Sequence, residues 1–564
     1  MQRLYTEQGR ALPDVPWARY PRPQLRRRDW LCLNGLWDFS CGGRSGKILV
    51  PFCPESLLSG VTVPPRPGEA LRYARRFTVP ADWHGRRVLL HFGAVMRDAR
   101  VSVNGRDAGT HDNGFLPFTL DVTDLLRPGE NELAVTCVND LDPRSPWGKQ
   151  KEKRGGMWYT PCSGIWQTVW LEPVPEGYIR ALTVTTGPDW FSVSSGDVGD
   201  GAVCFGGRRW APDERIPVPS PILWSPERPH LYAFSVERGA DTVYSYFALR
   251  TLTVERIGGV KRICLNGEPY FFHALLDQGY WSDGLWTPPD AEGFERDILA
   301  MKALGFNTLR KHIKIEPERF YYDCDRLGML VMQDMVNCGK YAFLRDTVLP
   351  TLGIQRLGDR ALQRDAATRQ NFLRSMRETV RLLRAHPSVV LWTIFNEGWG
   401  QFCADEAYDA LRALDDTRLI DSTSGWFRQT KSDVDSLHIY FKKLRLGKED
   451  RPQLLSEFGG YVYKLPEHSF NPERTYGYRM CRSRGAFLRD LRALYENEVL
   501  PLAEQGLCGA VYTQLSDVED ETNGLVTFDR AVSKLSPADF ADLAPRLQSA
   551  VRRGKMIPPE SQKA

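Results

Sequence analysis

The 564-residue sequence has no apolar run that approaches the ~20 residues a helix needs to cross a bilayer. Its first stretch, MQRLYTEQGRALPDV, has no apolar segment like that of a secretory signal. The 12 cysteines are scattered, with no C-x-x-C pair and no Cys/His cluster at zinc-ligand spacing. We therefore expect no membrane anchor, a cytoplasmic location with reduced thiols, and neither a metal nor another cofactor.

An excess of charge of one sign is also missing. The chain has 74 Lys and Arg against 70 Asp and Glu, a net charge of +4, which is no electrostatic footprint for nucleic acid. No repeat of solenoid period and no low-complexity tract is visible. Aromatic residues, in contrast, are plentiful, with 16 Trp and 21 Tyr. Aromatic faces suit sugar rings, although most of these side chains serve as core.

The length predicts several domains, because one hydrophobic core rarely grows to this size. From about residue 30 to 172, short alternating runs are separated by turn signals such as Asn104-Gly105, a pattern typical of a β-sandwich. A second β region follows to about residue 252, short for an immunoglobulin-like sandwich. We expect a jelly-roll sandwich over 1–175 and an immunoglobulin-like sandwich over 176–252.

After residue 253 the hydrophobic period changes to strand–helix alternation. Helical spacing over Asp290–Leu304 is followed by Gly305 and a strand at Phe306–Arg310, and similar units recur to the end of the chain. About eight strands over some 300 residues are the count and length of a (β/α)₈ barrel. We expect this TIM barrel over 253–564.

Two of the barrel strands end in a carboxylate. Leu391–Trp399 carries Glu397, and Leu454–Gly460 carries Glu457, each followed closely by glycine. We expect the two glycines after Glu457 to leave space for a substrate. Acids at strand ends point into the mouth of a parallel barrel. Two facing carboxylates are the machinery of glycoside hydrolysis. The other interpretation, two surface acids capping the following helices, explains the pair less well.

The motifs resemble those of glycoside hydrolase family 2, which contains β-galactosidases, β-glucuronidases and β-mannosidases. They are Asn307–His312, Phe395–Gly398, Ser456–Gly460 and Tyr512–Val518. The resemblance covers nearly the whole chain and implies the same order of two sandwiches and a barrel. It also implies that Glu397 is the general acid/base and Glu457 the nucleophile of a retaining reaction.

Physical reasoning agrees with those roles. The aromatic residues Trp392, Phe395 and Trp399 around Glu397 should favour its neutral form, whereas Glu457 needs cations and donors to stay charged. The resemblance implies that the tyrosine of the sixth strand holds the nucleophile, and that Asn396 donates to the sugar 2-hydroxyl. The expected substrate-binding residues are Asn396, Arg310, His438, Tyr440, Asp277, Trp426 and His312.

Several of these residues have a structural alternative. Arg310 can be a barrel-rim ion pair, His438 a core histidine, and Asp277 a loop cap. Trp281, Trp286 and Trp426 can stack on a sugar or serve as core. The loop Trp158–Gly164 of the first sandwich is expected to reach the barrel mouth, as its equivalent does in the family.

The sequence supports the reaction class more firmly than the sugar. We expect a retaining exo-β-glycosidase, β-galactosidase-like first. The alternative is a uronic-acid-specific enzyme, a β-galacturonidase or β-glucuronidase that reads the sugar carboxylate through Arg310, Lys311 or Lys314. The Asn-x-Lys triplet of family β-glucuronidases is absent; Asn337-Cys-Gly-Lys340 has a different spacing.

Two further hypotheses belong to other classes. An inactive carbohydrate-binding protein would have no reason to keep Asn396, Glu397 and Glu457 together. An endo-acting glycanase would need an open cleft, whereas two β domains and the loops around Trp281 and Trp286 favour a closed pocket. The expected partner is a β-glycoside or an oligosaccharide, with no nucleic acid and no membrane; a homo-oligomer is compatible with this sequence.

Overall fold

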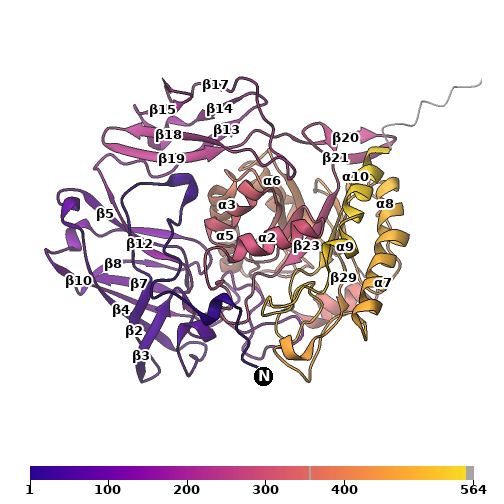
Figure 1. The fold of residues 1–564 in the computed structure, drawn as a ribbon, viewed down its shortest axis with the longest axis horizontal. Helices are drawn as coiled ribbons and strands as arrows, with labels where there is room; N and C mark the ends of the chain where they lie inside the picture. Colours follow the sequence, from indigo (N-terminus) through magenta and orange to yellow (C-terminus); the bar gives the residue numbers. More distant parts are fainter. Residues whose placement is uncertain (355–356, 554–564) are drawn as a thin grey trace, which may run out of the picture.

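The first part of the chain folds into a two-sheet sandwich, drawn in indigo and purple in the computed structural model, which describes residues 1–354 and 357–553 (Figure 1). A six-stranded sheet, in the order β3-β2-β4-β10-β7-β8, encloses a hydrophobic core with a four-stranded sheet, in the order β1-β12-β5-β9. These strands are β1 (Leu31–Cys32), β2 (Gly35–Cys41), β3 (Arg44–Val50), β4 (Ala70–Thr78), β5 (Arg87–Phe92), β7 (Ala99–Val103), β8 (Arg106–His111), β9 (Phe118–Asp121), β10 (Glu130–Val138) and β12 (Val169–Val174).

The predicted hairpin of this sandwich is confirmed. Asn104 and Gly105 join β7 to β8 with φ angles of 52° and 75°, the left-handed pair that a tight two-residue turn requires. Between β10 and β11 (Gly164–Ile165) the chain leaves the sandwich for 25 residues. This excursion, residues 139–163, is called the 139–163 loop below.

A second sandwich has its own core. Its sheets are β13-β14-β17 and β16-β15-β18-β19, and its buried residues form a separate cluster around Phe191 and Val236. The elements are β13 (Val184–Thr186), β14 (Trp190–Val193), α1 (Ser195–Val198), β15 (Ala202–Phe205), β16 (Arg208–Trp210), β17 (Ile216–Pro217), β18 (Tyr232–Arg238) and β19 (Asp241–Phe247). A small sheet of β20 (Leu252–Ile257), β21 (Val260–Leu265) and β22 (Glu268–Pro269) then leads into the third part.

Eight parallel strands form the barrel, as expected. Their order is β27-β26-β25-β24-β23-β32-β29-β28, so the chain winds round and returns beside its start; β27 and β28 are joined by a side-chain bond from Ser436 to Asp421. The strands are β23 (Phe272–Asp277), β24 (Thr308–Lys311), β25 (Leu330–Asp334), β26 (Val389–Asn396), β27 (Leu419–Ser424), β28 (Asp435–Ile439), β29 (Gln453–Gly459) and β32 (Leu507–Thr513).

Helices surround these strands (Figure 1). They are α2 (Gly293–Ala303), α3 (Glu318–Leu327), α5 (Ala366–Leu383), α6 (Ala404–Arg412), α7 (Arg484–Leu494), α8 (Leu500–Gln505), α9 (Pro537–Phe540) and α10 (Leu543–Arg553). The boundaries 1–175, 176–252 and 253–564 stay predictions. In the described residues no helix combines the length and the apolar character that crossing a bilayer demands.

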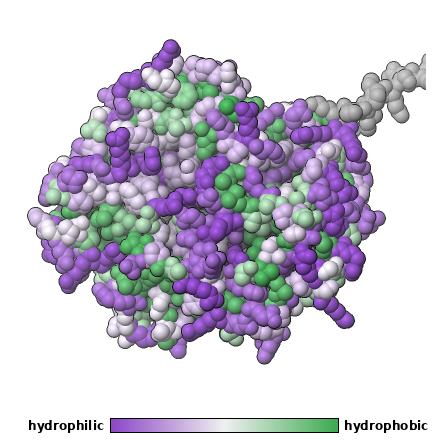
Figure 2. Space-filling model, in the orientation of Figure 1, coloured by the Kyte–Doolittle hydropathy of each residue, from purple (hydrophilic) through white to green (hydrophobic). Residues whose placement is uncertain are grey.

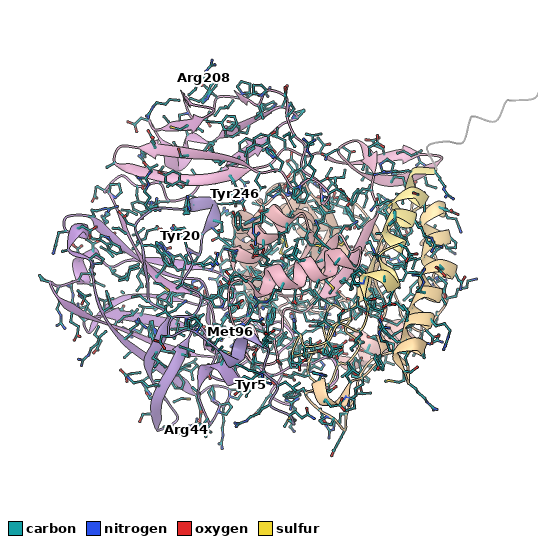
Figure 3. The ribbon with its side chains drawn as sticks, viewed as in Figure 1. Tyr5, Tyr20, Arg44, Met96, Arg208 and Tyr246 are labelled. Atoms are coloured by element: carbon teal, nitrogen blue, oxygen red, sulfur yellow. The ribbon has the colours of Figure 1, made fainter. Side chains whose placement is uncertain are left out.

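The three parts are joined by buried polar contacts. Arg27 pairs with Glu172 of β12 at 2.8 Å and with Asp241 of β19 at 2.7 Å, which links the two sandwiches. Tyr246, labelled in Figure 3, donates from β19 to Asp325 of α3 at 2.6 Å. These contacts fix the sandwiches against the barrel.

On the face shown in Figure 2, hydrophobic residues are scattered among hydrophilic ones.

Candidate active site

Glu397 stands on a left-handed turn at the end of β26. All eight residues of that strand are buried, and the chain then reverses through Glu397 and Gly398, whose φ angles are 52° and 73°. The backbone N–H of Glu397 donates to Ser424 of the next strand at 2.9 Å. The Glu397 side chain keeps 14% of its surface exposed, so its carboxyl group faces an opening at the carboxyl ends of the strands.

Glu457 is delivered by β29. The pairing of β29 with β28 and β32 shifts register around this residue, which is how a bulge re-aims a side chain. Its side chain keeps 7% of its surface exposed. The sequence predicted that the two following glycines leave space for a substrate. Instead, the space beside both is filled by protein rings. A Cβ at Gly459 would lie 2.4 Å from the Tyr512 ring, and one at Gly460 2.2 Å from the Tyr478 ring.

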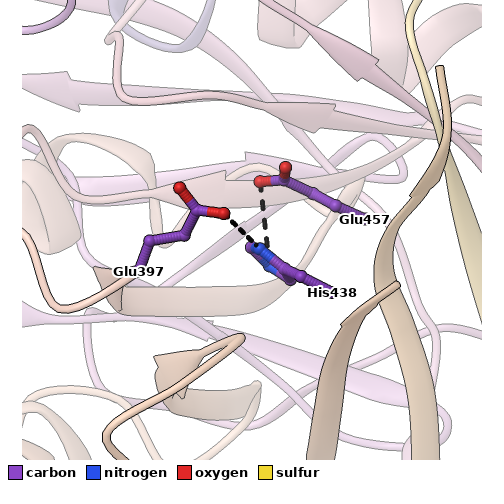
Figure 4. Close-up of side chains that lie close together, drawn as sticks. All are labelled: Glu397, His438 and Glu457. Carbon is purple, nitrogen blue, oxygen red and sulfur yellow. Dashed lines mark hydrogen bonds and ion pairs between the residues drawn. The ribbon is translucent and has the colours of Figure 1, made fainter. Parts of the chain in front are cut away.

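His438 lies between the two carboxyl groups (Figure 4). Its Nδ1 is 2.9 Å from Glu397 Oε1, and its Nε2 is 3.7 Å from Glu457 Oε1. Arg310 Nη1, which can only donate, lies 3.5 Å from the same Nε2. His438 therefore donates to Glu397 from Nδ1. The structure brings the three predicted residues within 4.8 Å of one another, measured between one polar atom of each.

Arg310 is fully occupied by protein groups. It donates from Nε to Asp334 at 3.0 Å, from Nη2 to Asn396 at 2.8 Å, and from Nη1 to the Ser456 carbonyl at 2.8 Å. Nη1 also lies 3.3 Å from Glu457 Oε1. The guanidinium thus fixes both the nucleophile strand and the residue before Glu397, and each of its three nitrogens already donates to a protein group.

The two carboxyl groups are driven to opposite protonation states. Burial raises the pKa of Glu397, and the Glu457 charge adds to this although the His438 hydrogen bond opposes it. Burial would also raise the pKa of Glu457, but His438 and Arg310 overcome it and hold that pKa at about 2. Glu397 is thus the group suited to carry a proton, and Glu457 the one suited to attack.

Tyr440 and His312 support this pair from opposite sides. The Tyr440 hydroxyl donates to Glu457 Oε2 and lies 3.0 Å from Thr513 Oγ1; burial and the Glu457 charge keep its pKa well above the usual value. His312 Nδ1 lies 2.7 Å from Asp334, the partner of Arg310. Burial lowers the pKa of His312 to about 4, so its ring is neutral near pH 7.

Trp426 contacts the turn that carries Glu397. Its indole N–H donates to the Glu397 carbonyl at 3.0 Å, and its ring stands edge-on to His438 at 5.4 Å. Asn396 accepts the Arg310 bond through Oδ1, which turns its amide NH₂ away from Arg310 and makes it the free donor of that side chain.

Asp277 lies outside this group. It accepts from Lys311 at 2.6 Å and from the Gly279 N–H at 2.8 Å, and Lys311 also pairs with Glu316 at 2.8 Å. Lys314 pairs with the same Glu316 at 2.9 Å. These contacts favour the interpretation of Asp277 as a loop cap, while its contact with sugar stays a prediction, and both lysines are already paired with a carboxylate. Sequence reasoning could not see Glu316 as their common partner.

Trp281 and Trp286 are core residues, which is one of the two alternatives that the sequence left open. The Trp286 ring packs 5.0 Å from Trp166 and 4.9 Å from Phe115, both in the first sandwich. Trp281 packs edge-on to Phe294 of α2 at 6.5 Å. Both are almost fully buried.

The 139–163 loop supplies site residues that the sequence did not identify individually. Its expected arrival at the barrel mouth is confirmed: Trp158 stacks on Trp399 at 5.3 Å, and Tyr159 donates to Glu521 at 2.5 Å. The Lys149 ammonium lies 5.6 Å from the centroid of the Trp399 ring. Only the motif Trp158–Gly164 gave a signal for this; Lys149 stands nine residues earlier in an unremarkable stretch.

A metal ion suits the site poorly. In the described part of the chain, Glu397, His438 and Glu457 are the one His/Cys/Asp/Glu group with the spacing of metal ligands. The Arg310 guanidinium already lies 3.3 Å from Glu457 and 3.5 Å from His438, and it would repel a second cation there. The donor set is arranged to share protons rather than to bind an ion.

In a comparison with known protein families, two domain models of one family match this chain. "Glycosyl hydrolases family 2, TIM barrel domain" matches residues 261–486, and "Glycosyl hydrolase 2 galactose-binding domain-like" matches residues 67–199. Together they cover well over half of the chain.

Individual relatives carry names of three activities. A β-galactosidase of Aeromonas hydrophila is 29% identical over 402 residues, which are 64% of this chain and 36% of the relative. A β-glucuronidase of Canis lupus familiaris is 27% identical over 457 residues, 67% of this chain and 65% of the relative. The chain thus spans about a third to two thirds of their lengths. The solved β-galacturonidase of Eisenbergiella tayi has the same fold, with a TM-score of 0.69, 21% identity, and coverage of 93% of this chain and 98% of the other.

Proposed function

Because the chain belongs to glycoside hydrolase family 2, we propose that it is a retaining exo-β-glycosidase acting by double displacement. One observation carries the proposal: two carboxyl groups within 4.8 Å, one with a raised pKa and one held at about 2. Retaining enzymes need such closely spaced carboxyls, about 5–5.5 Å, whereas inverting enzymes leave about 6.5–9.5 Å for a water molecule.

In the first step, Glu457 attacks the anomeric carbon of the terminal sugar while Glu397 gives its proton to the departing glycosidic oxygen. The C–O bond to the aglycone breaks and a glycosyl ester to Glu457 forms. In the second step, Glu397, now ionised, takes a proton from water as that water attacks the same carbon and releases Glu457. The sugar leaves with its β configuration.

The neighbouring residues have roles that follow from their contacts. Arg310 and Tyr440 stabilise the charged Glu457 before attack, and the Tyr440 donor must be given up as the ester forms. His438 donates to Glu397 and so favours its ionised form in the second step. The free NH₂ of Asn396 is the donor for the sugar 2-hydroxyl, a bond that strengthens as positive charge develops at the anomeric carbon.

The sequence placed neutral β-galactose first among substrates, and relatives named β-galactosidase and β-glucuronidase both match. A second candidate, a β-linked uronic acid, is favoured by Lys149 and is argued in the next subsection. A cytoplasmic location remains part of the proposal, supported by 12 free cysteines.

A panel of 4-nitrophenyl glycosides tests the proposal: β-galactoside, β-glucoside, β-mannoside, β-glucuronide, β-galacturonide and α-L-arabinopyranoside. We expect at least one to be hydrolysed, with a first product that keeps the anomeric configuration of its substrate by proton NMR. A first product of inverted configuration would contradict the retaining mechanism. Binding of these sugars without any turnover would favour the inactive carbohydrate-binding protein.

A further inference from the structure

Lys149 belongs to the first sandwich, but it lies at the mouth of the barrel. Two residues earlier, Trp147 donates from its backbone to Asn337 at 3.2 Å and from its indole to the Gly339 carbonyl at 3.1 Å, both just beyond β25. The Lys149 carbonyl accepts from Tyr159 at 3.0 Å within the same loop. The 139–163 loop is therefore fixed on both sides of Lys149.

The Lys149 side chain points toward the carboxyl groups. Its ammonium lies 5.6 Å from the Trp399 ring, two residues after Glu397, and 5.9 Å from the Tyr159 ring. Its positive charge is close enough to lower the pKa values of Glu397 and Glu457, behind the effects of burial and His438. The residue keeps 9% of its surface exposed. The ammonium thus borders the opening into which Glu397 and Glu457 point.

Among the described residues this ammonium makes no hydrogen bond and has no carboxylate within 4.0 Å, although it faces two aromatic rings and its charge lowers the pKa of Glu521. Other buried lysines differ. Lys311 has carboxylate oxygens at 2.6 and 2.8 Å, Lys314 at 2.9 Å, and Lys534 at 2.6 Å. Buried lysines are normally paired with a carboxylate. An ammonium that makes no such pair and borders the opening can accept an anionic group of a ligand.

We propose that Lys149 binds the carboxylate of a β-linked uronic acid and thereby determines the class of sugar that the site accepts. The proposal rests on the proposed glycosidase function, because it places the sugar beside Glu397 and Glu457. The cations expected to read such a carboxylate, Arg310, Lys311 and Lys314, are occupied by protein groups. The cation comes instead from the first sandwich, about 250 positions before the acid/base.

The test compares uronides with the matching neutral glycosides. For the wild-type protein we expect kcat/KM on 4-nitrophenyl β-galacturonide or β-glucuronide to exceed that on the corresponding galactoside or glucoside by on the order of 100-fold. Lys149→Met should remove most of that preference, with a much smaller shared loss on neutral substrates through Glu457. Lys149→Arg should recover part of it. Lys153→Met removes an exposed lysine from the same loop and should leave both rates unchanged.

A readout without turnover accompanies the kinetics. Free galacturonate or glucuronate should raise the melting temperature of the wild-type protein more than galactose or glucose does, and this difference should vanish in Lys149→Met. Preference for neutral glycosides by the wild type, or equal losses on both classes in Lys149→Met, would overturn the proposal while leaving the glycosidase intact. Failure of all six glycosides would reject the proposed function instead, and the melting shifts would then decide on Lys149 alone.

Discussion

At the scale of single residues, the site depends on one permanent charge. Arg310 contacts Asp334, Asn396, Ser456 and Glu457 at once, and it favours the ionised form of Glu457 against the effect of burial. His312, which is neutral near pH 7, does not replace it. The chemistry of both carboxyls is therefore tied to this guanidinium.

Replacing Glu457 by Gln removes the nucleophile with little change of shape. We expect kcat to fall by at least about 10⁴-fold, because no covalent intermediate can form. The melting temperature should change little, since Arg310 keeps Asp334 as its counter-charge. The matched variant Glu473→Gln changes an exposed acid and should keep full activity. Near-normal turnover by Glu457→Gln on an activated aryl glycoside would refute the assignment.

Replacing Glu397 by Ala should slow the second step most. A 4-nitrophenol leaving group needs little acid assistance, so the glycosyl-enzyme forms but water is not activated. Added azide should restore turnover and give a β-glycosyl azide, detected by NMR. The corresponding Glu457→Ala variant should give an α-azide, because azide then attacks the substrate directly. An α-azide from Glu397→Ala would mean that the two roles are reversed.

Arg310→Gln tests the electrostatic support. Glu457 must be ionised to attack. Because its pKa is about 2 in the wild-type protein, kcat/KM should fall on the acidic side only at very low pH. Without Arg310, burial raises that pKa, so the acidic limb of the kcat/KM profile should move up by at least about one pH unit. Breaking the buried pair should also cost about 3–5 kcal/mol of unfolding free energy. Arg445→Gln, at an exposed arginine, should shift neither; an unmoved acidic limb in Arg310→Gln would disprove the electrostatic role.

The sequence predicted Glu397 and Glu457 because each follows a β-prone run and carries a family motif. It misjudged what surrounds Glu397. The sequence predicted that Trp392 and Phe395 surround Glu397. Instead, the Trp392 indole donates to Asp415, and Phe395 stacks on Phe372 of α5. Side chains alternate along a strand, and the motif alone did not reveal on which side each one falls. Lys149 was missed because its neighbours belong to another domain.

At the scale of elements, the turn after β26 does the positioning. Glu397, Gly398 and Gly400 all have positive φ angles, 52°, 73° and 66°, and a Cβ at Gly400 would lie 1.6 Å from the Cys338 carbonyl oxygen. A strand cannot continue through such residues, so the chain turns sharply and leaves the acid at the barrel mouth. The eight strands were predictable from their periodicity, but the π-helical turns at Leu344–Val348 and Tyr495–Val499 were not, since they differ from α-helix by one residue of register.

Gly398→Ala should disturb this turn in two ways. The new Cβ would lie 2.2 Å from a Phe427 ring carbon, and the φ of 73° disfavours any side chain. Gly105→Ala is the matched control, with φ 75° and nothing within 4 Å. Backbone strain alone should cost the control about 1–2 kcal/mol, and crowding should add about 1–3 kcal/mol at Gly398. Urea unfolding measures both, and kcat should fall only in Gly398→Ala; equal losses of stability would argue that Phe427 yields freely.

At the scale of the whole molecule, the first sandwich contributes residues to the hydrophobic core of the barrel, although its two sheets also enclose a core of their own. Trp147, Trp158 and Trp166 of the former belong to the same buried cluster as Trp286 and Trp399 of the latter. The second sandwich keeps a separate core. We therefore expect the sandwich that carries Lys149 to unfold together with the barrel.

Two large-to-small variants separate these cores. Trp286→Ala should cost about 3–5 kcal/mol and lower the temperatures of unfolding and of activity loss together. Phe191→Ala, at a ring stacked 3.9 Å from Phe247 in the second sandwich, should cost a similar amount but leave activity at low temperature unchanged. Circular dichroism and residual activity after heating report both. Activity loss well before unfolding in Trp286→Ala would show that the shared core does not act as one unit.

The bond from Tyr159 to Glu521 has a consequence for biosynthesis. Its ends are 362 positions apart, so ribosomes adding about 5–20 residues per second need roughly 20–70 s to supply the second end after the first. For the first part of that interval Trp158 is also without Tyr341 and Trp399, the barrel side chains that pack on it. The 139–163 loop of the nascent first sandwich therefore exposes hydrophobic indole rings, to which a chaperone can bind until the barrel is complete.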